Sequence, residues 1–189
     1  MTFKIVVCAS GGGGNFRAIC EAQENIGFKV ERLIVDRRCG AIDVAYDFGI
    51  KTICLQKKSP DFFEDLDKFI PHDTDLIFLA GFFPIINRFL VNKWNKRIIN
   101  THPSLLPRYG GIGMYGVKVQ QAVMRNKEKY AGCTIHYVSE EVDQGDIILQ
   151  EKILVDYNLT PWELGGKVFK KENKLVVKAI SKLMSNDKK

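Results

Sequence analysis

The sequence lacks any apolar run near the roughly 20 residues that a membrane-spanning helix requires. Its N-terminal apolar segment, residues 5–9, is short and ends in glycines rather than at a small-residue cleavage site. We interpret this segment as the first strand of a cytoplasmic protein and expect no contact with a membrane.

The cysteines lack the spacing of a metal site. The five cysteines are Cys8, Cys20, Cys39, Cys54 and Cys133, and no two form a Cys-x-x-Cys pair. An odd number in largely apolar segments predicts reduced, mostly buried thiols. We therefore expect neither a disulfide framework nor a zinc site, and no metal cofactor.

The charge is modestly positive, at +6 with a pI of about 9.0. The basic residues are spread along the whole chain and include the pairs at 170–171 and 188–189. Nucleic-acid binding is one explanation, and attraction of small anions such as phosphates or polycarboxylates is the other. The scatter favours small-molecule substrates, and we predict no nucleic-acid partner.

Apolar strand patterns alternate with helical patterns through the first half of the chain. Continuous apolar strands in a β-α-β alternation predict a parallel sheet covered on both faces. We therefore expect a single-domain α/β, Rossmann-like fold with a mostly parallel, twisted sheet and helices on both faces. Strands are predicted at residues 4–9, 30–35, 52–55, 75–80, 97–101, 132–138 and 147–154, and helices at 15–24, 41–48, 60–70, 86–93, 117–126 and 160–184.

A glycine-rich segment, residues 10–15, follows the first predicted strand and opens the first helix. Free N–H groups and the helix dipole make such a terminus an anion site. A dinucleotide fingerprint needs a third glycine where this chain has Phe16, although Asp36 partly imitates its ribose-binding acid. The Gly-Lys-Ser/Thr of a P-loop is absent. A single phosphate fits best, and a plain tight turn remains an alternative.

Asn100 and His102 form a second polar feature, at the end of an apolar run and before Pro103. Residues i and i+2 of a strand point to the same face, so both side chains are expected in one site. A donor amide beside an imidazole on rigid backbone suits acyl transfer. The alternative is an ordinary structural pair at a strand end.

Asp143 lies in the segment Asp143-Gln144-Gly145-Asp146 between two predicted strands. Turn chemistry alone explains an aspartate there. If this loop folds over the strand ends, Asp143 would pair with His102 and fix its tautomer. His136 is interpreted as a structural strand histidine of secondary interest.

Taken in order, these motifs resemble the folate-dependent formyltransferases, and among them the phosphoribosylglycinamide formyltransferases. The resemblance rests on Ser-Gly-x-Gly-x-Asn near the N-terminus, Leu79-Ala80-Gly81-Phe82, Asn100-x-His102-Pro103-Ser104-Leu105-Leu106-Pro107, and Val142-Asp143-x-Gly145. It covers nearly the whole chain. It implies transfer of a formyl group from the cosubstrate 10-formyltetrahydrofolate to the amine of glycinamide ribonucleotide in purine biosynthesis, by a monomer or homodimer.

The resemblance also assigns roles to residues. Asn100 and a protonated His102 would stabilise the tetrahedral intermediate, and Asp143 would hold His102 and relay protons. Residues 1–189 would form one formyltransferase domain, with a phosphate-binding half at 1–100 and a folate-binding and catalytic half at 101–189. The other implied contacts are Gly13, Gly14 and Asn15 for the substrate phosphate, Pro103 and Glu172 for the substrate, and Phe83, Ile86, Val138, Ser139, Glu140, Glu141 and Val142 for the folate.

Some positions depart from the family's pattern. Gly14 stands where a serine is common, and Pro84 stands where the folate pocket commonly has an arginine. The loop at 110–116 is longer than usual and lacks a histidine, and Lys118 is a candidate for the substrate phosphate instead. These differences concern substrate contacts more than the chemistry.

Other functions remain open at this stage. The catalytic motif is shared by methionyl-tRNA formyltransferase, by sugar-nucleotide formyltransferases and by formyltetrahydrofolate deformylase. The chain length favours the ribonucleotide enzyme. A nucleotide-binding regulatory module and a nicotinamide oxidoreductase are the alternatives from other classes.

Overall fold

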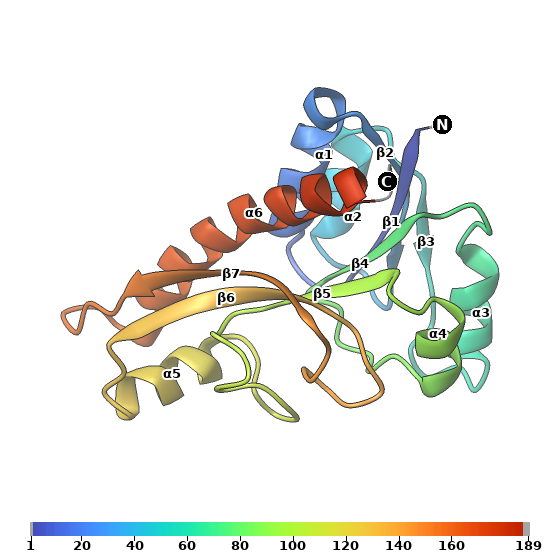
Figure 1. Cartoon of the computed structure of the whole chain (residues 1–189). Coiled ribbons are helices and arrows are strands. Elements are labelled where there is room, and N and C mark those ends of the chain that lie inside the picture. Colours follow the sequence, from blue (N-terminus) through green and yellow to red (C-terminus); the bar gives the residue numbers. More distant parts are fainter. Residues whose placement is uncertain (1, 187–189) are drawn as a thin grey trace.

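The structure is a computed structural model that describes residues 2–186. Its seven strands form one sheet in the order β3-β2-β1-β4-β5-β6-β7 (Figure 1). The predicted domain of residues 1–189 stays a prediction, and residues 1 and 187–189 lie outside the described part. The elements are β1 Phe3–Ala9, α1 Gly14–Ile26, β2 Phe28–Val35, α2 Ala41–Asp47, β3 Thr52–Cys54, α3 Phe62–Phe69, β4 Leu76–Ala80, α4 Arg88–Lys93, β5 Ile98–His102, α5 Val117–Arg125, β6 Tyr130–Tyr137, β7 Ile147–Leu154 and α6 Pro161–Asn186.

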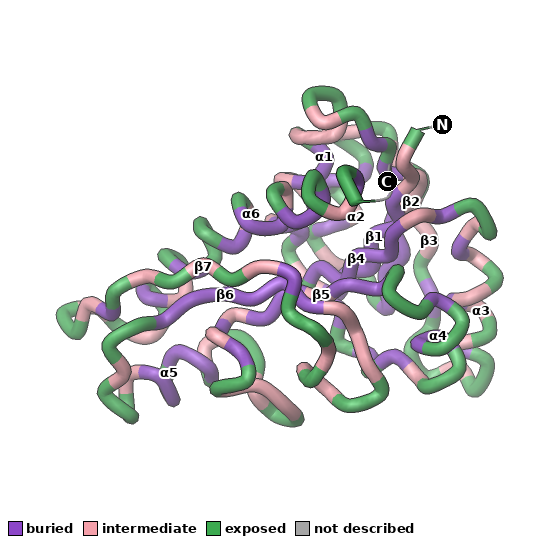
Figure 2. Tube along the Cα trace, viewed as in Figure 1, coloured by how far each residue is buried: buried purple, intermediate pink, exposed green. Residues whose placement is uncertain are grey.

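The sheet is mostly parallel, as predicted. Strands β1 to β5 pair in parallel, whereas β6 and β7 run antiparallel. The buried strand β1 divides its side chains between two cores: Ile5 and Val7 pack among residues of α1, α2 and α6, and Val6 and Cys8 among residues of α3 and α4. This two-sided burial explains why the strand reads as continuously apolar. Figure 2 shows the buried central strands between more exposed helices.

Local signals set the ends of several helices. A capping box opens α6: the Thr160 hydroxyl accepts the N–H of Glu163 at 3.3 Å, and the Glu163 carboxylate accepts the N–H of Thr160 at 2.8 Å. Helix α4 begins at Arg88 rather than at residue 86, because the Asn87 side chain accepts the Leu90 N–H at 3.0 Å. Within the described residues no helix is both long and apolar enough to span a membrane.

Candidate active site

A cleft of about 970 Å³ opens at the carboxyl ends of β1, β4 and β5. Parallel α/β sheets bind ligands at this edge because the loops after the strands surround a crevice there. The cleft extends from the glycine-rich segment at α1, past the loop after β4, to the loop between β6 and β7. It therefore joins the phosphate, catalytic and folate segments that the sequence predicted separately.

Asn100 and His102 both line this cleft from β5. Strand β5 extends through His102, one residue beyond the predicted end, so the strand itself fixes the imidazole. His102 is 4% exposed, and Asn100 is half-buried. The structure thus brings the amide and the imidazole together on one face, as their spacing predicted.

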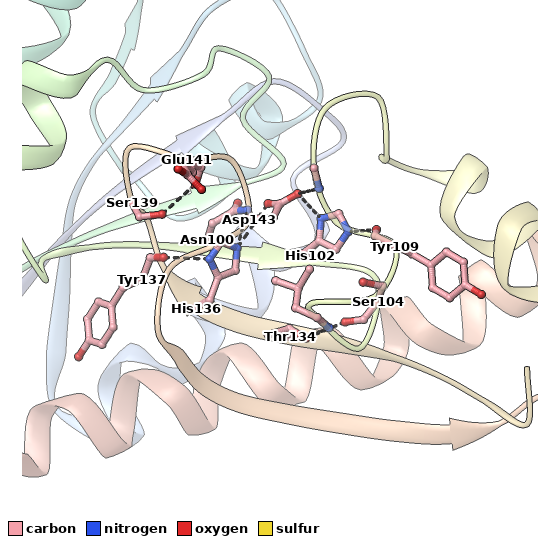
Figure 3. A network of polar contacts seen from close by, with 12 residues as sticks. Asn100, His102, Ser104, Tyr109, Thr134, His136, Tyr137, Ser139, Glu141 and Asp143 are labelled. Carbon is pink, nitrogen blue, oxygen red and sulfur yellow. Dashed lines mark hydrogen bonds and ion pairs between the residues drawn. The ribbon is translucent and has the colours of Figure 1, made fainter.

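Asp143 reaches the same place from the loop between β6 and β7. Its carboxylate lies between two imidazole rings, with Oδ2 3.4 Å from Nδ1 of His102 and Oδ1 3.6 Å from Nε2 of His136 (Figure 3). The backbone N–H of Gly111 donates to Oδ2 at 2.9 Å. Asp143 has a φ of 59°, in the left-handed region where aspartate and asparagine are best tolerated among non-glycine residues. The turn therefore serves to aim a buried carboxylate.

His102 faces an acceptor on each side of its ring. Nε2 lies 2.8 Å from the carbonyl oxygen of Tyr109, and Nδ1 faces the Asp143 carboxylate at 3.4 Å. The Tyr109 carbonyl and the Asp143 carboxylate therefore hold the imidazole between them, and the side chain is 5% exposed.

His136 lies in the cleft, although the sequence predicted only a structural role for it. It lies opposite Asn100 in the β5–β6 pairing, is 2% exposed and lines the cleft. Nδ1 lies 2.9 Å from the Tyr137 carbonyl oxygen, so Nδ1 carries the proton and Nε2 accepts from the Asn100 amide at 3.2 Å. Burial lowers the pKa of His136, which keeps the ring neutral. The neutral ring thus orients the Asn100 amide.

The three predicted phosphate residues all line the cleft at the start of α1. Gly13 has a φ of 80° and packs against Ala41, so the tight turn requires glycine. The space next to Gly14 that a serine side chain would need is occupied by the ring of Phe169 from α6. The Asn15 side chain donates to Glu172 rather than pointing freely into the cleft. A phosphate bound here would therefore meet mainly the backbone N–H groups of residues 13–15 at the helix start, which we call the glycine cradle.

Glu172 lies on α6, 5% exposed, and lines the cleft beside Asn15. Burial raises the pKa of Glu172, and the hydrogen bond from Asn15 opposes this shift. Pro103 also lines the cleft, and its carbonyl accepts from the Gln120 side chain at 2.7 Å. Both predicted substrate residues are thus at the cleft wall.

The Glu172→Gln variant is expected to have a higher free energy of unfolding at neutral pH than the unmodified chain. A carboxyl with a raised folded-state pKa loses stabilisation as the pH rises above its ordinary value of 4.5, and an amide does not. Urea unfolding at about pH 5 and about pH 8 should show a larger gain at the higher pH. The exposed Glu24→Gln is the control, and an equal gain at both values would contradict the assignment.

Most predicted folate residues line the end of the cleft near β4. One of them, Glu140, lies outside its wall and pairs with Arg88 at 2.9 Å. Lys118, the phosphate candidate, also lies outside the wall and donates to the Tyr115 hydroxyl at 3.1 Å. A folate contact by the Glu140 side chain and a phosphate contact by Lys118 are therefore not supported. The predicted residues that do line the cleft are Phe83, Ile86, Val138, Ser139, Glu141 and Val142.

The cleft wall includes residues that the sequence did not single out. Gln120 is 1% exposed, and its Oε1 has no hydrogen-bond partner within residues 2–186. The signal for it was a polar residue between Val119 and Ala122 on the apolar face of α5. Arg37 and Phe169 also line the cleft, but nothing in their local sequence marks them.

No group of three or more histidine, cysteine, aspartate or glutamate side chains within the described residues is arranged to hold a metal ion. The fold and the cleft define a site of the acyl-transfer type, with an amide donor, an imidazole and a carboxylate at the carboxyl ends of a Rossmann-like sheet. Residues 3–180 match the formyl transferase family, and the chain belongs to that family.

Among its relatives is the phosphoribosylglycinamide formyltransferase of Bacillus subtilis, at 34% identity over 96% of this chain and 94% of the relative. The chloroplastic enzyme of Arabidopsis thaliana is 38% identical over 94% of this chain, which spans 64% of that relative. The chain also spans 60% of the Vigna unguiculata enzyme, so it covers less than two thirds of both plant relatives.

Solved structures agree with this family. A phosphoribosylglycinamide formyltransferase from Anaplasma phagocytophilum superposes with a TM-score of 0.89 at 31% identity, covering 99% of this chain and 89% of that one. A formyltetrahydrofolate deformylase from Pseudomonas syringae has a TM-score of 0.87 at 19% identity, covering 98% of this chain and 62% of that one. The second comparison shows the shared fold alone.

Proposed function

We propose that this chain transfers the formyl group of 10-formyltetrahydrofolate to the amine of glycinamide ribonucleotide, a step of de novo purine biosynthesis. The observation that carries the proposal is the convergence of Asn100, His102 and Asp143 in a cleft that also includes the glycine cradle of α1. Relatives named phosphoribosylglycinamide formyltransferase support the choice of substrate.

In the proposed reaction the substrate amine attacks the formyl carbon, and a new C–N bond forms. The carbonyl oxygen becomes an oxyanion, which the second N–H of the Asn100 amide is free to meet because the first is bound by His136. The bond from the formyl carbon to the folate nitrogen then breaks. The attacking amine loses a proton, and the leaving nitrogen gains one.

His102 and Asp143 would serve this charge and proton movement. The His102 Nε2–H is directed at the Tyr109 carbonyl, so in this arrangement the imidazolium acts on the oxyanion through its charge. Direct donation would require the contact to Tyr109 to open. Asp143 stabilises the imidazolium and provides the acceptor that a proton from the amine can reach through water.

An activity assay tests the proposal directly. The purified chain is mixed with 10-formyltetrahydrofolate and glycinamide ribonucleotide, and the appearance of deformylated folate is followed by absorbance. Turnover that depends on the ribonucleotide is expected. Deformylation without it would identify a deformylase, and turnover only with methionyl-tRNA or a sugar-nucleotide amine would identify a different transferase.

The assembly and location of the chain are further proposals. We infer a monomer or homodimer, which light scattering of the purified protein would test, and a cytoplasmic location.

A further inference from the structure

Arg37 follows β2 directly and lines the cleft. One edge of its guanidinium is bound by Asp36, with Nη2 2.8 Å from Oδ2 and Nε 3.2 Å from both carboxylate oxygens. The Asp36 side chain has no exposed surface, whereas the Arg37 side chain is 43% exposed. The buried carboxylate therefore holds the guanidinium by one edge at the cleft.

Two other strand ends fix the same guanidinium. Ser10, after β1, lies near enough to the Asp36 carboxylate to help lower its pKa, and its Oγ accepts the backbone N–H of Phe83 at 2.9 Å. The Phe83 ring, after β4, lies under the guanidinium, with its centroid 5.2 Å from Cζ of Arg37. Ser10, Asp36, Arg37 and Phe83 thus form a closed set of contacts, which we call the arginine clamp.

The clamp leaves part of the guanidinium available. Arginine has five N–H donors. Asp36 accepts from the Nε–H and from one N–H of Nη2. Within residues 2–186 no hydrogen-bond acceptor contacts Nη1. If Arg37 served only to pair with Asp36 at the end of β2, its position over the exposed Phe83 ring in the cleft would have no explanation. A fixed, half-exposed guanidinium suits bidentate binding of an anion, because little side-chain entropy remains to be lost.

A second cation lies at the same side of the cleft. Lys57, in the turn after β3, also lines the cleft, and β3 is the neighbour of β2 in the sheet. The glycine segment of α1 adjoins the clamp: Gly11 follows Ser10 directly, and its carbonyl accepts the N–H of Ala41 at 3.1 Å. The cleft wall here therefore presents backbone N–H groups at the start of α1 and cationic side chains after β2 and β3.

We propose that the arginine clamp, assisted by Lys57, binds a carboxylate in the tail of the formyl donor. The inference rests on the proposed function, in which the donor is a folate. A folate joins an aromatic ring to a carboxylate-bearing tail. The clamp offers an apolar ring, Phe83, next to a guanidinium, which are the matching partners for these two groups.

The test compares two ligands in calorimetric titrations of the whole chain: folate, and a pteroyl amide that has the same rings but no glutamate carboxylates. Arg37→Gln is expected to weaken folate binding about tenfold and to leave binding of the amide unchanged. Arg38→Gln is the matched control, because Arg38 is the adjacent exposed arginine and does not line the cleft. It should bind both ligands as the unmodified chain does.

A second variant keeps the test decisive if Arg37→Gln does not fold with Asp36 left unpaired. The double variant Asp36→Asn/Arg37→Gln removes both charges of the buried pair, and the same selective loss is expected. Equal weakening of both ligands, no weakening, or weakened binding of inorganic phosphate alone would overturn the proposal. Binding needs no turnover, so a chain that binds folate selectively through Arg37 but fails to formylate the ribonucleotide would contradict only the proposed function.

Discussion

Asp143→Asn is expected to lower kcat about a thousandfold while the protein stays folded. The variant removes the negative charge that lies between His102 and His136. In the proposed mechanism a protonated His102 would then lack its counter-ion, and the proton of the attacking amine would lack its acceptor. Initial-rate assays with saturating substrates measure the effect.

The fold should survive this change for two reasons. Asparagine is tolerated at the φ of 59° that this position requires, and its side-chain oxygen can still accept the N–H of Gly111. Asp146→Asn, an exposed change in the same turn, is the control and should retain full activity. Near-normal turnover of Asp143→Asn would remove Asp143 from the mechanism.

Asn100→Ala is expected to lower kcat by about 10²–10³, with little change in the affinity for folate. In the proposed mechanism the amide donates to the oxyanion, and alanine would leave both that oxygen and the His136 acceptor without a partner. A loss of this size corresponds to about 3–4 kcal/mol of transition-state stabilisation. Single-turnover kinetics separate a loss in the chemical step from slow product release.

The matched control is Asn95→Ala, an exposed asparagine in the connection that leads into β5. It should leave kcat and the folate affinity unchanged. If Asn100→Ala weakened folate binding as much as it lowered kcat, the amide would act in ground-state binding and not on the transition state.

Much of the fold could be predicted from the sequence. Strand β1 had to be buried on both faces because its apolar residues run without a break, and Thr160 with Glu163 marked the start of α6. These signals act over a few residues, so the local sequence contains them in full. The predicted start of α4 at residue 86 was two residues too early, because its N-cap, Asn87, follows an apolar segment that continues the helical pattern.

Within the site, the shared orientation of Asn100 and His102 followed from strand geometry alone. Their partners did not. His136 acquired its role from the antiparallel pairing of β6 with β5, which brings together residues 36 positions apart. The same holds for Glu140, which pairs with Arg88 on α4 although its neighbours in the sequence line the cleft.

The sequence by itself determined the alternation of strands and helices, the backbone cradle at Gly13 and the paired polar side chains of β5. Only the tertiary structure decided which groups share the cleft, because contacts between distant segments depend on strand order and pairing register. It made Asp143 the common neighbour of two imidazoles, and it joined Ser10, Asp36, Arg37 and Phe83 into the arginine clamp. A turn aspartate and a half-exposed arginine line the cleft because residues from other strands pack against one side of each.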